Sequence, residues 1–575
     1  MGEQRPDGSA SSSAAPPGLL GGLLPRRRPR WARGFDHVGH PWLLSAEERG
    51  NDASGLPAWR GGNDVCALVD GRSYLPALAA ALAGAGAGDA VLFAGWRADP
   101  DELLDDGGPP VVAALVGAAA RGAQVRGLLW RSHSEVLGYT YRAGRDLARA
   151  VTAAGGQVLL DHRVRPLGSH HEKFVVRTRP GGPDGDPGGG LGGDLGGDVA
   201  FVGGIDTARS RRDGGDHPGD RQTRPFAPVY GATPAWHDVQ LRLSGPAVRD
   251  VERVFRQRWA DPAPVVRWPW HAVPDRLSGL APVARPLPEP APAPAPAGPC
   301  TVQLLRTLPR RRPAYPFAPD GERSVARGYA KALARARRLV YVEDQYLWSR
   351  DVARIFADAL RRSPELRLIA VAPRHIDREG RFDALASRLG QNTAWRTVAE
   401  AGGDRVQLFD LENAAGRPVY VHAKVCVVDD VWAAVGSANL NRRSWTHDSE
   451  LTAAVLDEQR DERRPVDPGG LGDGARTFAR SLRLTLMREH LDRADGDDAD
   501  LLDPDGAADV MGEAAAELDA WHAAGCVGPR PPGRLRRHPW RTGGGTVRRW
   551  LTTPVYDLAY DPDGRPWRMR LRRAF

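Results

Sequence analysis

The stretch that decides the fold is "VHAKVCVVDDVWAAVGSANLNRRS", residues 421–444. It places His422 and Lys424 two residues apart at the head of an apolar run that predicts a β-strand. The chain has 79 Lys plus Arg, yet its only lysines are Lys173, Lys331 and Lys424. A second lysine follows a histidine in the same way, in "HEK" at 171–173, whereas Lys331 fits the solvated face of a helix. The repetition indicates that the two His-x-Lys positions require an ammonium group.

The elements around the two copies also repeat. Each half offers a helix, a strand, a second helix and strand, and a further strand before its His-x-Lys motif. These expected elements lie at 73–82, 89–96, 111–130 and 156–160 in the first half, and at 325–333, 338–347, 352–372 and 404–409 in the second. A turn of small residues follows each motif, at 202–206 and 435–439, and we expect it to open a helix. The fold class is therefore α/β, with two similar halves related by a pseudo-two-fold axis, each a mixed sheet flanked by helices.

Length and composition set the domain boundaries. A chain of 575 residues is too long for one core, and an Ala-Pro-rich stretch at 284–299 reads as an extended linker. We predict a disordered segment, an N-terminal catalytic half, the linker, a C-terminal catalytic half and a C-terminal extension, at 1–50, 51–280, 281–300, 301–500 and 501–575 respectively.

The composition favours an anionic partner and disfavours several classes of protein. The formal charge is +8 and the pI is near 9.5. Four cysteines without a CxxC pair argue against a zinc site and against a disulfide-built domain. We find no EF-hand or cluster of carboxylates, so the sequence predicts neither metal nor cofactor, and activity that survives a chelator. The lack of a long apolar run predicts no transmembrane segment and favours a cytoplasmic enzyme.

The repeated motif suits the handling of phosphate. On a strand, residues two apart share a face, so each histidine would stand beside its lysine. An imidazole can attack, and a compact ammonium can hold an anion where the wide fork of arginine would not fit. Small residues let an anion approach backbone N–H groups, and Ser and Asn side chains can donate to phosphoryl oxygens. The candidate binding residues are Gly203, Gly204, Ser437 and Asn439.

The second copy reads H-x-K-x4-D-x6-G-S-x-N, with Asp429 at its aspartate position. It resembles the motif of the phospholipase D superfamily, which occurs twice per active site. Three further stretches resemble the larger, lipid-cleaving members of that superfamily: "YVEDQYL" at 341–347, "PAWHDVQLRLSGPAVRDVERVFRQRW" at 234–259 and "LMREHL" at 486–491. The similarity extends over roughly residues 60 to 500 and implies two phospholipase D-like halves.

The resemblance implies a two-step displacement at phosphorus in a monomer, with a phospholipid as substrate and peripheral contact with the membrane. His171 would form a phosphohistidine while His422 protonates the leaving alkoxide, and His422 would then activate water or an alcohol. Lys173 and Lys424 would hold the phosphate. Asp238 in "WHDV" and Glu450 in "HDSE" match the family's orienting carboxylates. The resemblance assigns Asp429 to bracing the fold.

Several points stay open. The first copy has Thr178 where the motif aspartate should fall and a Gly-rich insert at 181–198, so Asp194 or Asp198 could replace that aspartate. Glu343 could contact substrate or cap a strand.

The same chemistry would serve a phosphatidyltransferase of the cardiolipin synthase type or a nuclease. Nuclease members of the superfamily tend to be short single-copy chains, so nucleic acid is the less favoured substrate. A degenerate binding module would be expected to have lost a motif residue, and both copies are intact. The sequence leaves the head group and the acceptor undetermined.

Overall fold

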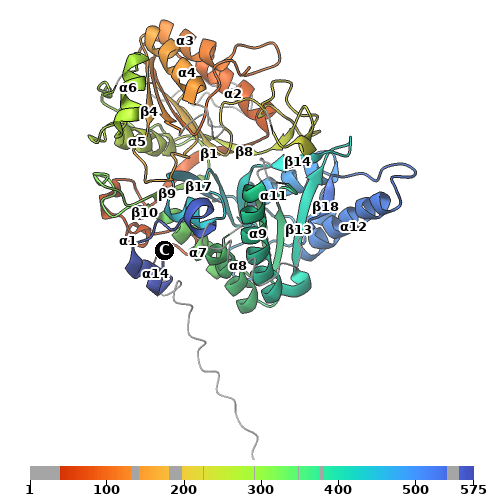
Figure 1. Ribbon diagram of the computed structural model, residues 1–575. Coiled ribbons are helices and arrows are strands. Elements are labelled where there is room, and N and C mark those ends of the chain that lie inside the picture. The colour runs from red at the N-terminus through yellow and green to blue at the C-terminus, as the bar shows by residue number, and fades with distance from the viewer. Residues whose placement is uncertain are drawn as a thin grey trace, which may run out of the picture.

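The computed structural model describes residues 39–132, 141–179, 197–224, 226–280, 282–290, 292–347, 349–375, 381–539 and 556–575. Two α/β halves follow each other along the chain, the first red to yellow-green and the second green to blue in Figure 1. The α/β fold class with two similar halves is confirmed. Most of the Gly-rich insert, including Asp194, lies outside the described residues.

The first half contains one sheet of seven strands and a short extra strand, β7. Its strands are β1 Arg60–Val69, β2 Ala90–Gly95, β3 Gln124–Trp130, β4 Gln157–Asp161, β5 Phe174–Thr178, β6 Val199–Gly203, β7 Ala235–His237 and β8 Val239–Ser244. Its helices are α2 Gly71–Ala83, α3 Val111–Ala120, α4 Tyr141–Ala153, α5 Ala247–Trp259 and α6 Pro269–Leu277. The spatial order is β4-β3-β2-β5-β6-β8-β1, in which β4, β3 and β2 are parallel and the later pairs are antiparallel.

The second half repeats this arrangement. Its strands are β9 Cys300–Leu308, β10 Glu322–Arg323, β11 Leu339–Asp344, β12 Arg367–Val371, β13 Val406–Glu412, β14 Pro418–Val421, β15 Lys424–Val428, β16 Trp432–Gly436, β17 Glu450–Asp457 and β18 Leu535–Arg537. Its helices are α7 Ser324–Arg335, α8 Arg350–Arg362, α9 Arg381–Gly402, α10 Arg442–Thr446, α11 Thr477–Leu491, α12 Pro504–Ala523 and α14 Trp567–Arg572. The order β13-β12-β11-β15-β16-β17-β9 matches the first sheet strand for strand, with the same three parallel strands at one edge.

The two sheets are joined and share a core. Strand β1 pairs with β9, where Arg60 faces Val302 and Asn63 faces Cys300. Each sheet has one face covered by its own helices, α2 to α4 in the first half and α7 to α9 in the second. The other two faces contribute to one apolar cluster with α5, α11 and α12. Because one core spans both halves, residues that belong to different halves can meet in one site.

Three differences from the sequence predictions concern chain segments outside the sheets. Residues 39–50 were expected to be disordered but are folded: α1 (Ala46–Arg49) is capped by Ser45, and Trp42 is buried. Lys331 is buried and not on a solvated face, because its ammonium donates to Leu43 O (2.8 Å) and to Glu48 (2.6 Å) of this segment.

The C-terminal extension also contributes to the second half. Strand β18 pairs with β13, and helix α12 packs against these two strands. The Ala-Pro linker is held along α5, since Arg249 donates to Pro292 O (2.7 Å) and Arg256 donates to Pro288 O (2.6 Å). These contacts give the linker a fixed course across the first half.

Candidate active site

The two motif histidines, His171 and His422, lie at junctions between strands and not inside one strand as predicted. Strand β14 ends at Val421, one residue before His422, and β15 begins only at Lys424. The first copy is alike, because β5 begins at Phe174, after the whole His-x-Lys motif. The reason is that the backbone at each histidine pairs with the other half of the molecule instead of continuing its own sheet.

These backbone pairings are reciprocal. His171 N–H donates to Ser449 O at 2.9 Å, next to an isolated bridge between His170 and Ser449. His422 N–H donates to His237 O at 2.7 Å, where β14 and β7 run parallel. The segment that carries each histidine is thus held by the strand end of the opposite half.

The two predicted carboxylates lie against the histidines, and each comes from the opposite half. Glu450 Oε2 is 2.9 Å from His171 Nδ1, and Asp238 Oδ2 is 2.6 Å from His422 Nδ1. Both carboxylates are fully buried, whereas the histidine side chains remain 15% and 8% exposed, respectively. A carboxylate on Nδ1 leaves Nε2 of each ring free to react. The sequence identified these four residues but did not indicate that the pairs cross between halves.

Both lysines are buried beside their histidines. Lys173 Nζ donates to His171 O at 3.2 Å and lies 3.4 Å from Asp206. Lys424 Nζ donates to His422 O and, at 3.2 Å, to Gln345 Oε1. Each ammonium is therefore held at the backbone carbonyl of its histidine, where it adds positive charge without exposing a long flexible side chain.

Gly203 and Gly204 were expected to let an anion approach backbone N–H groups, but their own N–H groups have acceptors within the fold. Gly203 N–H donates to Lys173 O (3.4 Å) and Gly204 N–H donates to Val239 O (3.0 Å). The glycines are needed for space: a Cβ atom on Gly204 would lie 2.0 Å from Asp238 Oδ1. No helix follows this turn directly, so the first half lacks the expected helix N-terminus.

Ser437 contacts the carboxylate of Glu450. Its hydroxyl donates to Glu450 Oε2 at 2.6 Å, and it lies before α10, whose N-cap is Asn441. Asn439 is buried, and its Oδ1 has no hydrogen-bond partner among the described residues. Asp429 accepts three backbone N–H bonds of 2.8 Å, which begin at Arg337 and lead into β11.

In the first half, Thr178 stands at the position that corresponds to Asp429, and Asp198 makes only some of the contacts that Asp429 makes in the second half. Thr178 is buried in β5, and Asp198 accepts from Arg179 N–H at 2.6 Å and from Arg249 at 3.0 Å. Glu343 is buried and accepts from His237 and His490, each at 2.7 Å. Each of these carboxylates therefore has a structural partner.

Charge and burial shift the pKa values within the site. Burial, followed by Lys173 and Lys424, holds the pKa of His171 well below its usual value. Burial, Lys424 and Arg211 do the same for His422, with smaller contributions from Lys173 and His171. Burial and the neighbouring Asp448 raise the pKa of Glu450 to about 8. Groups from both halves thus act on one another, which indicates one shared electrostatic environment.

Three residues beside the histidines had no signal in the sequence analysis. Trp96 packs edge-on against His171, with ring centroids 6.4 Å apart. The ring of Trp236 lies 4.8 Å from that of His422, and Arg211 stacks on Trp236 at 3.5 Å. Trp236 is itself the first residue of "WHDV", and Arg211 follows "VGGID" by five residues, but no role was assigned to either from the sequence.

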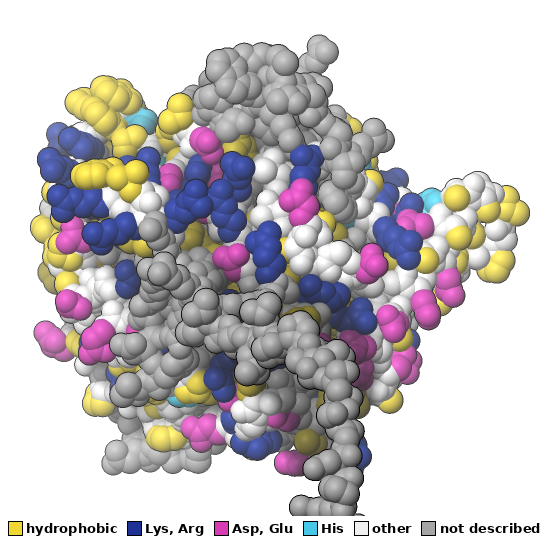
Figure 2. Space-filling model, turned by 90° about the horizontal axis from the view of Figure 1, so that it is seen from below, with side chains coloured by type: hydrophobic (Ala, Val, Ile, Leu, Met, Phe, Trp, Pro, Cys, Tyr) yellow, Lys and Arg dark blue, Asp and Glu magenta, His cyan; other side chains and the backbone are white. Residues whose placement is uncertain are grey.

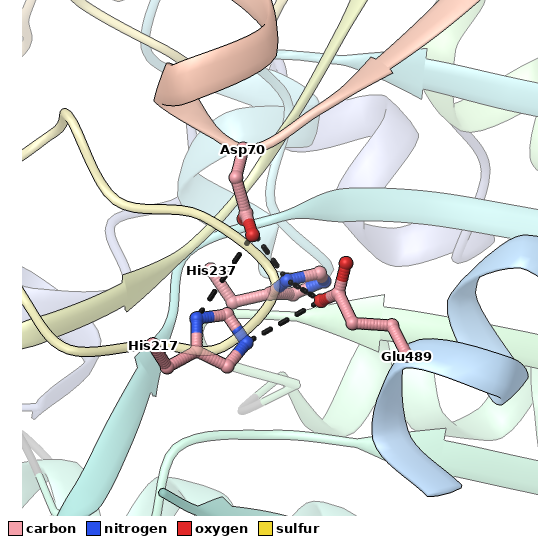
Figure 3. Close-up of side chains that lie close together, drawn as sticks. All are labelled: Asp70, His217, His237 and Glu489. Carbon is pink, nitrogen blue, oxygen red and sulfur yellow. Dashed lines mark ion pairs between the residues drawn. The ribbon is translucent and has the colours of Figure 1, made fainter. Parts of the chain in front are cut away.

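The sequence showed no spacing typical of a metal site, yet the fold gathers metal-binding side chains behind Asp238. His237 precedes Asp238 and lies with Asp70, His217 and Glu489 in one buried group, shown in Figure 3. The four come from separate elements, which is why no local pattern revealed them.

Comparisons with known proteins agree on one family. Residues 145–281 match the family described as phospholipase D, and residues 329–462 match the family described as cardiolipin synthase, PLD-like domain. Each match contains one of the two His-x-Lys motifs. Phospholipase D1 of Schizosaccharomyces pombe is 24% identical over 56% of this chain and 27% of its own length. Phospholipase D alpha 1 of Vigna unguiculata is 26% identical over 52% of this chain and 47% of its own.

The chain covers about half or less of these relatives' own length. Among solved structures, phosphatidylserine synthase of Haemophilus influenzae Rd KW20 aligns with 72% of this chain and 87% of its own, at 11% identity and a TM-score of 0.46. In the part of the chain that the structure describes, none of the helices has the length and apolar character needed to cross a membrane.

Proposed function

Because the chain belongs to the phospholipase D superfamily, we propose that it is a phosphodiesterase that cleaves phospholipid head groups through a phosphohistidine intermediate. The observation that supports this most directly is the pair of reciprocal contacts, His171 with Glu450 and His422 with Asp238. Two histidines, each oriented by a carboxylate and flanked by an ammonium, supply a nucleophile, an acid and charge neutralisation.

In the proposed reaction, Nε2 of His171 attacks phosphorus and the bond to the head-group oxygen breaks. His422 gives its proton to that oxygen, which leaves as an alcohol. His422, now neutral, takes a proton from water or from an acceptor alcohol, which attacks the phosphohistidine and releases His171. Lys173 and Lys424 hold the phosphoryl oxygens throughout.

The low pKa values of both histidines fit the site without substrate. Burial and the ammonium groups disfavour an imidazolium there. A bound phosphodiester brings one negative charge, which offsets the ammonium groups and raises the pKa of the ring nearest the leaving group. Substrate entry therefore favours protonation of His422 when the acid is needed.

Transfer to an alcohol is the second candidate. It is favoured by the match of residues 329–462 to the cardiolipin synthase family and uses the same phosphohistidine. Hydrolysis and transfer differ only in the acceptor of the second step. Thin-layer analysis of mixed phospholipids, with and without ethanol, separates phosphatidic acid from phosphatidylethanol; a parallel reaction with single-stranded DNA tests the nuclease alternative.

The roles of the histidines are tested by substitution. His171→Ala should abolish turnover nearly completely, as removal of a nucleophile costs on the order of a millionfold in other enzymes. His422→Ala should recover part of its activity with a p-nitrophenyl phosphodiester, whose leaving group needs no proton, because general acid help is worth roughly 100 to 10,000-fold. Recovery in the His171 variant instead would exchange the two roles, and full activity in both would rule out this site.

We further propose peripheral contact of this enzyme, in the cytoplasm, with an anionic lipid surface. Helix α6 exposes Trp270 (64%), Val273 (56%) and Leu277 (85%), and Arg267 stacks on Trp268 at its start. Figure 2 shows one face of the molecule, on which basic, acidic and hydrophobic side chains are mixed. Tryptophan beside basic groups suits a lipid interface. Trp270→Ala should lower activity on anionic vesicles several-fold and leave activity on the soluble p-nitrophenyl diester unchanged; equal losses on both substrates would contradict it.

A further inference from the structure

Four side chains from separate elements converge at one place; one of them precedes Asp238 in the sequence and another contacts it (Figure 3 shows the four side chains). One lies between β1 and α2, one in the loop after β6, one at the end of β7 and one in α11. We call Asp70, His217, His237 and Glu489 the buried donor cluster. Each offers one nitrogen or oxygen atom, and these four atoms all lie within 4.8 Å of one another.

The spacing of these atoms fits a single ion. His237 Nδ1 is 3.1 Å from Asp70 Oδ1 and 2.9 Å from Glu489 Oε1, and His217 Nε2 is 3.3 Å from the same Glu489 oxygen. Donors bound tetrahedrally at about 2.0–2.1 Å from zinc stand roughly 3.3 Å apart. Two imidazoles and two carboxylates are ligands that zinc accepts.

The four side chains pair chiefly with one another. Among the described residues, Asp70 Oδ2, His237 Nδ1, Glu489 Oε1 and the ring nitrogens of His217 make no well-aligned hydrogen bond, although ion-pair contacts of 2.9–3.3 Å link His237 and His217 to the two carboxylates. Asp70, His217 and His237 are at most 1% exposed. Buried polar atoms are nearly always well partnered, so four donor atoms gathered this closely with poorly aligned contacts favour a ligand among them.

A second layer of contacts fixes the ring of His237. Its Nε2 lies 2.7 Å from Glu343, which also accepts from His490 at 2.7 Å and from Tyr341. Glu343 accepts a hydrogen bond from Nε2–H of His237 and holds the ring with Nδ1 directed at the cluster, as carboxylates do behind metal-bound histidines.

The charges balance with one divalent ion. Two carboxylates carry −2, which one M²⁺ neutralises.

We propose that the buried donor cluster binds one divalent cation of the zinc class, with a structural role. Glu489 comes from the second half and the other three residues from the first, so the ion would tie the halves together. It would also brace the active site: Asp238 N–H donates to Asp70 Oδ1 at 3.0 Å, and His237 O accepts from His422 N–H. The ion contacts no reacting atom.

Metal analysis of the full chain tests this proposal. Purified protein, dialysed against metal-free buffer and then supplied with one equivalent of ZnCl₂, should retain about one zinc per chain and gain thermal stability. CaCl₂ should not substitute, because calcium requires about six to eight oxygen ligands. Crystals should show an anomalous peak at the zinc edge among the four residues.

Glu489→Gln preserves the side-chain shape and His217→Ala removes one ring, so both should weaken zinc binding by ~10-fold or more. The matched control is His522→Ala, which breaks a remote pair with Glu412 at 2.8 Å and should bind zinc normally. A wild-type chain that takes up no zinc overturns the proposal. Variants of Glu489 and His217 that fold, by circular dichroism, and bind zinc as tightly as the control also overturn it. Zinc content is independent of turnover, so this result is separate from that on the proposed function.

Discussion

Replacing Asp238 by Asn should disable His422, which belongs to the opposite half, and leave His171 able to attack. Asp238 Oδ2 lies 2.6 Å from His422 Nδ1 in a buried pair. A hydrogen bond to a charged group is worth about 1.5–3 kcal/mol, or roughly tenfold to 150-fold in rate. Loss of the tautomer-fixing carboxylate in Ser-His-Asp enzymes lowers kcat ~10⁴-fold. We expect turnover of phospholipid to fall by ~10²- to 10⁴-fold.

The assay is the first turnover of a p-nitrophenyl phosphodiester in a stopped-flow instrument. Asp238→Asn should give a burst of about one nitrophenolate per site and then slow turnover, because the first step needs no acid and the second lacks its base. Glu450→Gln should give no burst, since Glu450 orients the attacking His171 at 2.9 Å. The matched control is Glu412→Gln, at the remote pair with His522, which should retain wild-type kinetics.

The result depends on pairing across the halves. If each carboxylate served the histidine of its own half, the burst would appear in Glu450→Gln and be absent from Asp238→Asn, and our reasoning would be refuted. Identical behaviour of the two variants would refute it as well, because the two pairs would then have no separate roles.

Two further predictions concern the space and charge around the same pairs. Gly204→Ala places a Cβ atom 2.0 Å from Asp238 Oδ1, so it should displace that carboxylate, lower kcat ~100-fold and destabilise the fold by about 1–3 kcal/mol in urea unfolding; unchanged kinetics would show that the contact is easily relieved. Burial lowers the pKa of Lys424 to about 8, against the opposing charges of Asp238 and Asp344. The ammonium is present below that pH and is lost as pH rises through it, so kcat/KM should decline above pH 8; a profile that stays flat to pH 10 contradicts this role for Lys424.

The sequence by itself determined the repeated unit. The choice of lysine in a chain that otherwise uses arginine, the two His-x-Lys motifs and the alternation of helix and strand are properties of neighbouring residues, and local periodicity is sufficient to read them. Asp238 and Glu450 could be named in advance for another reason, because they match positions of the phospholipase D superfamily that the sequence resembles. The class of fold and the two histidines followed from the repeated pattern.

The sequence misled where a residue's partner lies far along the chain. The small residues Gly203 and Gly204 suggested an anion-binding turn, but Asp238 fills the space beside Gly204, and Val239 and Gln240 fill the space beside Gly203. The motif histidines were placed inside strands, but their backbone pairs with the opposite half. Lys331 looked solvated because its partners, at 43 and 48, lay in a segment without any periodic signal.

Only the tertiary structure decided which groups act together. The contact of His171 with Glu450 spans 279 positions and that of His422 with Asp238 spans 184, and both exist because the two sheets dock face to face around α5 and α11. The buried donor cluster arises in the same way, from four elements of two halves. Patterns of neighbouring residues determine where a strand or helix forms, but they carry no information about the relative placement of two sheets, which is set by packing of the shared core.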